Sequence, residues 1–404
     1  MRWDGLRLSA GQEGAGQGSA SQGSAGQGSA GQEGAGQRGA GQRGTQAEGG
    51  GQAPALFERD TVARTTVART FDTPGFRGMT FYEVHARSVI NRVPESSRMA
   101  FRWTINPYRG CSHGCVYCFA RNTHVYLDMD AGLDFNSRIV VKVNAPELVR
   151  RELAAPKWRG EHIAMGTNVD CYQRAEGRYR LMPGIIGALR DAANPFSILT
   201  KGTLILRDLD LLADAAQVTD VGLNVSVGFI DKELSRSAEP GTPGPARRLA
   251  VCAAISARGL RCGVLMGPIL PFLSDSPGQL AAAVRQIAAA GAARVSPIVL
   301  HLRPGAREWF LQWLGEQHPD LVEPYRRLYG SGAYAPRAYQ QRIGAQVREL
   351  AAQYGIGQAS PAAARSLPER SRPERSRLAR PAAGGSQGRP QADGAAAAVQ
   401  LSLL

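Results

Sequence analysis

The sequence lacks an apolar run long enough to span a bilayer, which takes about 20 consecutive apolar residues. Its start, MRWDGLRLSAGQ, also lacks the apolar core of a signal peptide. Together these absences predict a cytoplasmic protein without membrane contact, a compartment in which thiols stay reduced. Six cysteines in such a chain favour a metal site or catalysis over a disulfide framework.

Lysine is also scarce. The 404 residues carry a formal net charge of +14, so Arg supplies nearly all of the positive charge. A basic surface suits phosphate-bearing partners such as nucleic acid. Part of the excess lies in the C-terminal stretch that contains PERSRPERSR, where a solvated tail is the alternative explanation. The only lysines are Lys142, Lys157, Lys201 and Lys232.

Two low-complexity segments lie on either side of the part that can fold. Pentapeptides of Gly, Ala, Gln and Ser repeat over residues 9–52, and a biased composition returns over 358–404. Neither segment can bury a core, so we expect both to be disordered. The repeat serves as a linker or interaction tail, or is a tolerated expansion. The other predicted parts are an ordinary segment at 1–8, a lead-in at 53–100, a barrel at 101–302 and a helical extension at 303–357.

Between these ends, strand-like apolar runs alternate with amphipathic helical patterns. Repeated βα units force a parallel sheet covered by helices, so we predict an α/β fold with an open or partial barrel. A helix is expected from about Phe119, and RIVVKV followed by APELVRRELA adds a further unit. The six other strand-like runs are AFRWTINPY, EHIAMGTNVD, FSILTKG, VGLNVSVGF, CGVLMGPILP and RVSPIVLHL. The helical patterns after the last five are LMPGIIGALRDAA, LRDLDLLADAAQ, ARRLAVCAAISARG, GQLAAAVRQIAAAG and REWFLQWLGEQ.

Active sites of such folds collect at the C-terminal ends of the strands. The stretch NPYRGCSHGCVYCFA places Cys111, Cys115 and Cys118 at such an end, within eight residues. Thiolates select zinc or iron–sulfur clusters. Structural zinc usually takes four ligands, and the sequence has no second Cys-x-x-Cys pair. Three thiolates can hold a [4Fe–4S] cubane and leave one iron open. Three core cysteines are the alternative, which the flanking Gly110 and Gly114 disfavour.

The C-x-x-x-C-x-x-C spacing, with Tyr117 before the last cysteine, resembles that of the radical S-adenosylmethionine (SAM) enzymes. The resemblance implies a partial (β/α)6 barrel and a [4Fe–4S] cluster whose open iron binds SAM. It also implies reductive cleavage of SAM to methionine and a 5′-deoxyadenosyl radical, which removes a hydrogen atom from the substrate.

Further stretches, among them MGTNVDCYQRAEGRYRLM, FSILTKGTLILRDLDLL and EPGTPGPARRLA, resemble the spore photolyase-like, or DNA repair photolyase-like, subgroup from about Met79 to Gly357. The implied partners are a reductant such as flavodoxin or ferredoxin, and a nucleic-acid lesion as substrate. The oligomeric state is left open.

Site residues follow from the same resemblance, position by position. Cys111, Cys115 and Cys118 match the cluster ligands. Lys201 matches a lysine near the SAM carboxylate, or is a solvated lysine at a strand end. Ser226 matches a strand-end hydroxyl near the ribose, or is an ordinary serine inside the barrel. Glu239 either binds SAM or orders its loop. The residues at the place of a Gly-Gly-Glu that binds the SAM amino group in many members are Thr167, Asn168 and Asp170.

Spore photolyases return a hydrogen atom from a cysteine in the loop after the second strand, and Gly166 stands at that position here. Cys171, five residues later, is a candidate hydrogen donor or a non-catalytic loop cysteine. Cys252 and Cys262 are expected in the core. His113 is interpreted as a spacer between ligands.

Each of the remaining candidate residues has two possible roles. Arg247 or Arg248 approaches the SAM carboxylate or covers the barrel. Gly267 and Pro268 line the adenine side of the SAM site or end a strand. His301 faces the substrate cavity or packs in the barrel. Residues expected only to pack their helix are Trp309, Phe310 and Trp313.

Two other classes of protein compete with an enzyme. One is a nucleic-acid-binding module with an iron–sulfur or zinc site but no SAM chemistry. The other is a plain electron carrier. The missing fourth ligand and the repeated βα units disfavour the first, and the size of the barrel disfavours the second.

Overall fold

The computed structural model describes residues 66–95, 97 and 99–357. The expected repeat at 9–52, the tail at 358–404 and the segment 1–8 lie outside these residues, and the predicted domain boundaries stay predictions.

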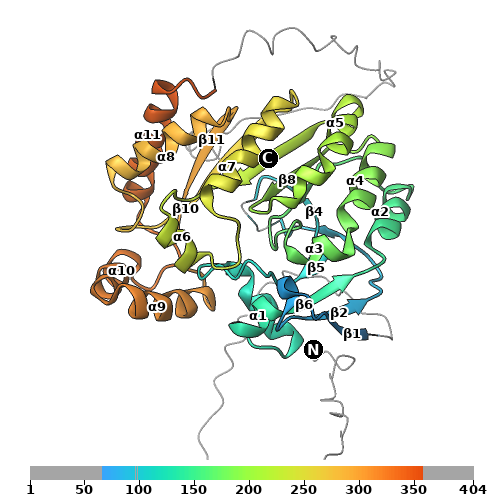
Figure 1. Ribbon diagram of the computed structural model, residues 1–404, viewed down its shortest axis with the longest axis horizontal. Coiled ribbons are helices and arrows are strands. Elements are labelled where there is room, and N and C mark those ends of the chain that lie inside the picture. Colours follow the sequence, from blue (N-terminus) through green and yellow to red (C-terminus); the bar gives the residue numbers. More distant parts are fainter. Residues whose placement is uncertain (1–65, 96, 98, 358–404) are drawn as a thin grey trace, which may run out of the picture. The chain divides into compact units, whose positions relative to one another are not determined.

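Six parallel strands form most of the larger sheet (Figure 1). Its order is β11-β10-β9-β8-β7-β4-β3, and every neighbouring pair is parallel except β3 with β4. This arrangement confirms the predicted α/β partial barrel. The strands are β3 (Ile90–Arg92), β4 (Trp103–Ile105), β7 (Ile163–Met165), β8 (Phe196–Thr200), β9 (Val221–Ser226), β10 (Cys262–Ile269) and β11 (Arg294–Val299).

Each of the six runs read as barrel strands forms one of these parallel strands. In β7 all three side chains are buried, and in β8 four of five are. Strands of a parallel sheet with covered faces are buried on both sides, which explains why these runs read as continuous apolar stretches rather than alternating ones.

Helices cover the sheet between successive strands. In Figure 1, α2 and α4 lie side by side, α4 also contacts α5, and α7 packs on β9 and β10. Ser276 caps α8 by accepting from the Gln279 amide, with Pro277 in the first turn. The helices are α1 (Leu133–Ser137), α2 (Ala145–Leu153), α3 (Arg174–Tyr179), α4 (Leu181–Asp191), α5 (Leu209–Val218), α6 (Lys232–Ala238), α7 (Pro245–Ala257), α8 (Pro277–Ala289), α9 (Ala306–Gln317), α10 (Val322–Tyr329) and α11 (Arg337–Gln353).

A second, four-stranded sheet corrects one prediction. RIVVKV forms β6, but β6 pairs with β2 and β5 and does not enter the barrel. Local periodicity shows that a run is a buried strand but not which sheet it joins. The strands of this sheet, in the order β1-β2-β6-β5, are β1 (Thr66–Thr70), β2 (Thr80–Val84), β5 (Tyr108–Arg109) and β6 (Arg138–Lys142).

The helix expected from Phe119 is also wrong. The chain there forms two short 3₁₀ helices, η2 (Phe119–Thr123) and η3 (Val125–Leu127), and then α1. Asn, Thr and His in this stretch have low helix propensity, and the Thr123 hydroxyl bonds to the Ala120 carbonyl at 2.6 Å. The other 3₁₀ helices are η1 (Pro74–Phe76), η4 (Leu204–Asp208) and η5 (Pro319–Leu321).

The C-terminal helices differ in what they cover. The predicted helix after the last strand forms as α9, but it contacts η2 beside the cysteine loop, whereas α11 packs on β11 and α8. None of the described helices is long and apolar enough to cross a membrane.

Candidate active site

The cysteine loop lies at the C-terminal end of the barrel strands, between β5 and η2. Cys111 and Cys115 are buried and Cys118 is half-buried. Gly110 and Gly114 have positive φ values of 78° and 62°. A Cβ at Gly110 would lie 2.9 Å from the Arg138 carbonyl oxygen. Glycine is therefore needed at Gly110, in the turn that begins the cysteine loop.

Segments from across the barrel hold this loop by its backbone. The Gln173 side chain accepts from the Ser112 amide and donates to the Gly110 carbonyl, both at 2.9 Å. The Gly241 amide donates to the His113 carbonyl at 2.9 Å. A Cβ on Gly241 would lie 2.0 Å from the Ser112 oxygen, so the two backbones are in close contact.

Arg121 anchors the loop from its other side. Its guanidinium is fully buried and donates to the carbonyl oxygens of Gly114 (3.0 Å) and Cys115 (3.1 and 3.2 Å). Further bonds reach Ala131 and Gly132, at 3.0 and 2.8 Å. Arg121 was not among the predicted site residues, although it follows the last cysteine by only three positions.

Asp170 connects the loop to the end of β8. Its carboxylate lies 3.4 Å from His113 Nδ1 and accepts from the Thr200 hydroxyl (2.7 Å) and the Lys201 amide (2.6 Å). Burial opposes the charge, but His113 and these hydrogen bonds lower the pKa of Asp170 to about 2. His113 is therefore a bonded part of the site and more than a spacer.

Lys201 and Ser226 meet at the ends of the neighbouring strands β8 and β9. Lys201 Nζ donates to Ser226 Oγ at 2.6 Å and lies 3.8 Å from Glu239 Oε1. The Glu239 carboxylate is buried and also accepts from the Tyr117 hydroxyl and from Arg248. Burial disfavours its charge, but Arg248 and Lys201 lower the pKa of Glu239. Five residues far apart in sequence thus form one connected network.

The other candidates lie around this network in different ways. Thr167 and Asn168 are half-buried just after β7, and Cys171 is fully buried. Arg247 is exposed, so Arg248 is the arginine that joins the site. A Cβ on Gly166 would lie 1.8 Å from the Leu199 carbonyl oxygen, so this position cannot hold a cysteine without a shift of the backbone.

Several packing predictions are confirmed. Cys252 on α7 and Cys262 at the start of β10 are fully buried. Phe310 and Trp313 are also buried in the core. Trp309 does more than pack its helix, because its ring lies 4.7 Å from the Arg121 guanidinium carbon. The Gly267 carbonyl accepts from Ser226 Oγ at 3.0 Å, which joins the GPILP stretch to the network.

His301 lies just past β11 and is half-buried. Its ring makes an edge contact with the Tyr334 ring, with the two ring centroids 4.5 Å apart. Burial lowers the pKa of His301 to about 4. It is therefore neutral at physiological pH.

The thiols suit a soft metal group. Burial and the nearby Glu239 carboxylate raise the pKa of Cys115 to about 12, so metal binding has to displace a proton there. Three thiols beside the Arg121 cation form a donor set that fits an anionic iron–sulfur cluster. Among the described residues, no three His, Cys, Asp or Glu side chains gather closely enough to share a single metal ion.

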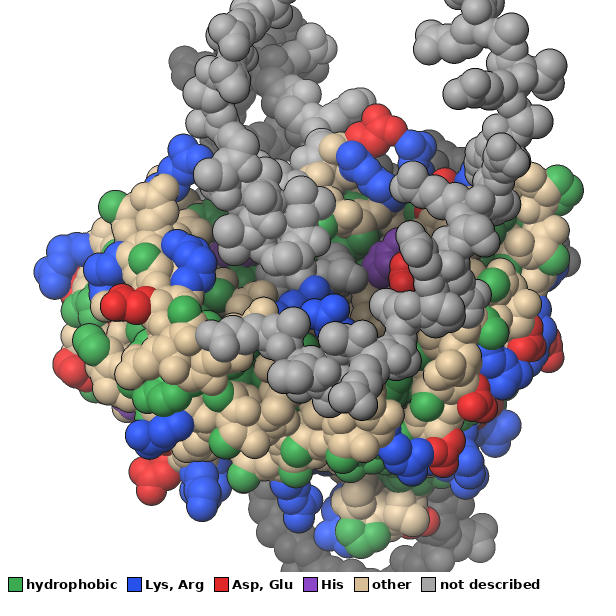
Figure 2. All heavy atoms as spheres, turned by 90° about the horizontal axis from the view of Figure 1, so that it is seen from above, with side chains coloured by type: hydrophobic (Ala, Val, Ile, Leu, Met, Phe, Trp, Pro, Cys, Tyr) green, Lys and Arg blue, Asp and Glu red, His purple; other side chains and the backbone are tan. Residues whose placement is uncertain are grey.

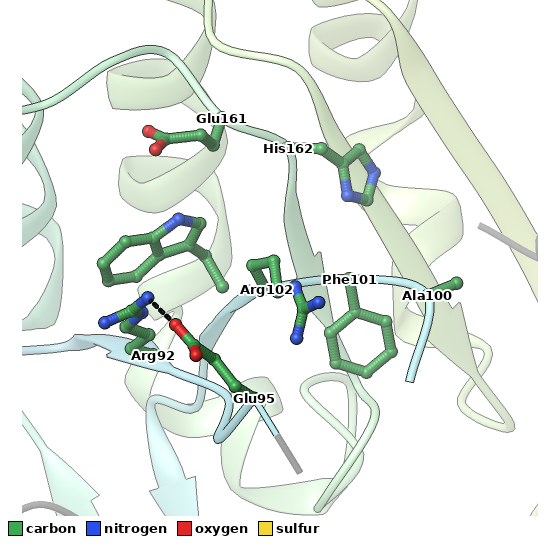
Figure 3. Close-up of a pocket in the computed structure, with 8 residues that line it drawn as sticks. Arg92, Glu95, Ala100, Phe101, Arg102, Glu161 and His162 are labelled. Carbon is green, nitrogen blue, oxygen red and sulfur yellow. Dashed lines mark hydrogen bonds and ion pairs between the residues drawn. The ribbon is translucent and has the colours of Figure 1, made fainter. Parts of the chain in front are cut away.

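A separate cavity of about 550 Å³ lies at the other end of the strands (Figure 3). Its lining includes Trp103, which begins β4, and His162, which precedes β7. Arg92 and Glu95 form an ion pair in it at 2.5 Å. None of the predicted site residues lines this cavity.

The chain is similar in sequence to known proteins. Residues 105–282 match the Radical SAM superfamily. An uncharacterized protein of Mycobacterium tuberculosis strain H37Rv is 51% identical over 293 residues, covering 72% of this chain and 86% of the relative. The chain belongs to the radical SAM superfamily. A protein of Methanocaldococcus jannaschii is 29% identical over 174 residues, or 43% of this chain and 62% of that protein.

Among solved structures, the fold is similar to that of spore photoproduct lyase complexed with dinucleoside spore photoproduct. The TM-score is 0.52 at 16% identity, over 69% of this chain and 80% of the lyase. A variant of that lyase with bound AdoMet and the same dinucleoside gives a TM-score of 0.50 at 16% identity, over 65% and 77% of the two chains. Members of the superfamily are enzymes that use a [4Fe–4S] cluster and SAM, which are therefore the cofactors of this chain.

Proposed function

We propose that Cys111, Cys115 and Cys118 hold the [4Fe–4S] cluster and that this chain cleaves SAM at its open iron. The observation that carries this proposal is the convergence of the cysteine loop, Lys201 and Ser226 at one end of the barrel. When bound, the cluster supplies the electron that breaks the sulfonium bond of SAM.

The residues of the chain would position SAM rather than react with it. Lys201 is a cation beside the loop and suits the SAM carboxylate. Asp170 stays ionised at neutral pH and suits the SAM amino group. Ser226 suits the ribose hydroxyls. Thr167 and Asn168, at the end of β7, are the other polar side chains proposed to contact SAM.

Cofactor loading and SAM cleavage test this proposal together. The protein is reconstituted anaerobically, analysed for iron and sulfide, and reduced with dithionite in the presence of SAM. We predict that Cys115→Ala loses the cluster and forms no 5′-deoxyadenosine. Cys252→Ala, which removes a buried thiol from α7, should keep both. A full cluster in Cys115→Ala would contradict the ligand assignment, and bound zinc without sulfide would favour a binding module.

We further propose that the substrate is a nucleic acid. The support is an exposed ring surface next to the cysteine loop, formed by Phe119, Arg303 and Tyr334. Phe119 and Tyr334 are 45% and 49% exposed. Arg303 lies 5.4 Å from the Phe119 ring centre and donates to the Tyr334 hydroxyl at 3.3 Å. Exposed aromatic rings and guanidinium groups stack on nucleobases.

The fold gives weaker support of the same kind, since a structure with similar fold is complexed with a dinucleoside. Net charge adds less. The Lys and Arg side chains that are visible on the face in Figure 2 have Asp and Glu side chains among them. The ring surface therefore carries the substrate proposal, and a cytoplasmic location and a flavodoxin or ferredoxin donor stay predictions.

Oligonucleotide binding tests the ring surface. We predict that Phe119→Ala weakens binding of a fluorescent single-stranded oligonucleotide about tenfold, because one stacked base is worth roughly 1–3 kcal/mol. Val218→Ala removes a side chain that is 46% exposed at the opposite end of the strands and should have no effect. Equal affinity of the two variants, measured by anisotropy, would contradict a nucleic-acid contact at Phe119.

A further inference from the structure

Arg121 is a buried cation without a carboxylate partner. No Asp or Glu in the described part of the chain lies within 4.0 Å of its guanidinium. Its polar contacts are carbonyl oxygens and the Asn136 side-chain oxygen, at 3.1 Å. The rings of Phe135 and Trp309 cover it at 5.2 and 4.7 Å from the guanidinium carbon. These groups are dipoles and quadrupoles, and none of them carries a negative charge.

Burying an unpaired charge costs several kcal/mol even after the structure relaxes. Arginine stays protonated in proteins, so it does not avoid this cost by losing its proton. Asp130 also acts on this charge, but it is exposed and lies beyond 4.0 Å, where water screens it. A compensating negative charge is therefore expected closer to the guanidinium. The guanidinium bonds directly to the backbone of Cys115, which lies in the middle of the cysteine loop.

A cluster on this loop would supply that charge. Three thiolates on a [4Fe–4S] core leave the group negative, and one added electron makes it more negative. A fixed cation in a water-poor site stabilises the more negative state more strongly. Arg121 would therefore stabilise the reduced cluster more than the oxidised cluster.

We propose that Arg121 raises the reduction potential of the cluster and so makes the reducing electron easier to accept. The proposal rests on the assignment of Cys111, Cys115 and Cys118 as ligands. The step is a one-electron transfer from an external reductant to the cluster. No bond is made or broken in it, and Arg121 keeps its proton throughout.

Arg121 also fixes the loop, and the test has to separate charge from shape. Arg121→Gln removes the charge and keeps hydrogen-bonding capacity, whereas Arg121→Lys keeps the charge and loses the planar fork. Arg174→Gln is the matched control, because Arg174 is bonded to the loop through its backbone but has an exposed side chain.

The measurement is the midpoint potential of each reconstituted protein without SAM. The electron paramagnetic resonance signal of the reduced cluster monitors the titration. We expect at least a tenfold fall in the reduction equilibrium constant in Arg121→Gln, which is about 59 mV or more for one electron. Arg121→Lys and Arg174→Gln should stay close to the unaltered protein. A full cluster with unchanged potential in Arg121→Gln would overturn the proposal.

A second variant decides the case in which Arg121→Gln binds no cluster. Asn136→Asp keeps Arg121 and its hydrogen bond but gives the cation a carboxylate partner. We expect a similar fall in potential, and an unchanged potential would again overturn the proposal. An unaltered protein that takes up no cluster would instead overturn the ligand assignment, together with this inference.

Discussion

Gly166 shows how one residue limits the chemistry of the site. The sequence resemblance predicts that it occupies the position at which spore photolyases carry a hydrogen-donating cysteine. Its φ is 78°, and any Cβ there would meet the backbone of Leu199. Cys171 is the nearest alternative donor on this loop, and its role stays a prediction.

Replacing Gly166 tests this steric argument. We predict that Gly166→Ala destabilises the fold by more than about 2 kcal/mol, because the backbone has to shift and the positive φ disfavours a side chain. The control is Gly187→Ala in α4, where a Cβ meets nothing within 4 Å. That change should be neutral or stabilise by up to about 1 kcal/mol. Urea denaturation of the two variants measures the difference, and equal midpoints would refute the clash.

Some residues of the site were visible in the sequence and others were not. The three cysteines stand close together, so their spacing alone reveals them. Arg248 and Glu239 are paired only after α6 and α7 fold against the loop, and nothing local in the sequence marks them as partners. Arg121 had a signal, its place three residues after Cys118, but its burial depends on Trp309, which lies 188 positions further along.

At the scale of elements, the six barrel strands and the helices after the last five of them were predictable, because these strands are apolar and these helices amphipathic. The contacts between these elements were harder to predict. The strand β6 reads like a barrel strand but joins the smaller sheet, and α9 follows the last strand while α11 covers it. Pairing of distant segments depends on tertiary contacts that periodicity does not encode.

The Glu239–Arg248 pair joins the loop after α6 to helix α7, and both side chains are fully buried. We predict that Glu239→Gln lowers the free energy of unfolding by about 3 kcal/mol, because it leaves the Arg248 charge unpaired. Asp210→Asn breaks the exposed Arg258–Asp210 pair and should cost about 1 kcal/mol or less. Chemical denaturation at pH 7 compares them, and equal losses would contradict the importance of burial.

The same pair has a pH signature. Because the folded-state pKa of Glu239 is lowered, its stabilisation is present above the unfolded value, about 4.3, and is lost as the pH falls through the folded value. The acid-induced loss of stability should therefore be smaller in Glu239→Gln than in the unaltered protein.

At the scale of the whole molecule, the fold brings the cysteine loop, two strand ends and the Glu239 network to one end of the barrel. The cavity near Trp103 lies at the other end and is separate from this chemistry. The class of enzyme follows from the superfamily, whereas the fold alone does not determine the substrate.

The central claim is that three thiolates leave one iron free to bind SAM. Mössbauer spectra of protein reconstituted with ⁵⁷Fe, recorded with and without SAM, test it most directly. We predict that about a quarter of the iron absorption, one site of four, shifts when SAM is added. Spectra that SAM leaves unchanged, with all four irons alike, would contradict the account.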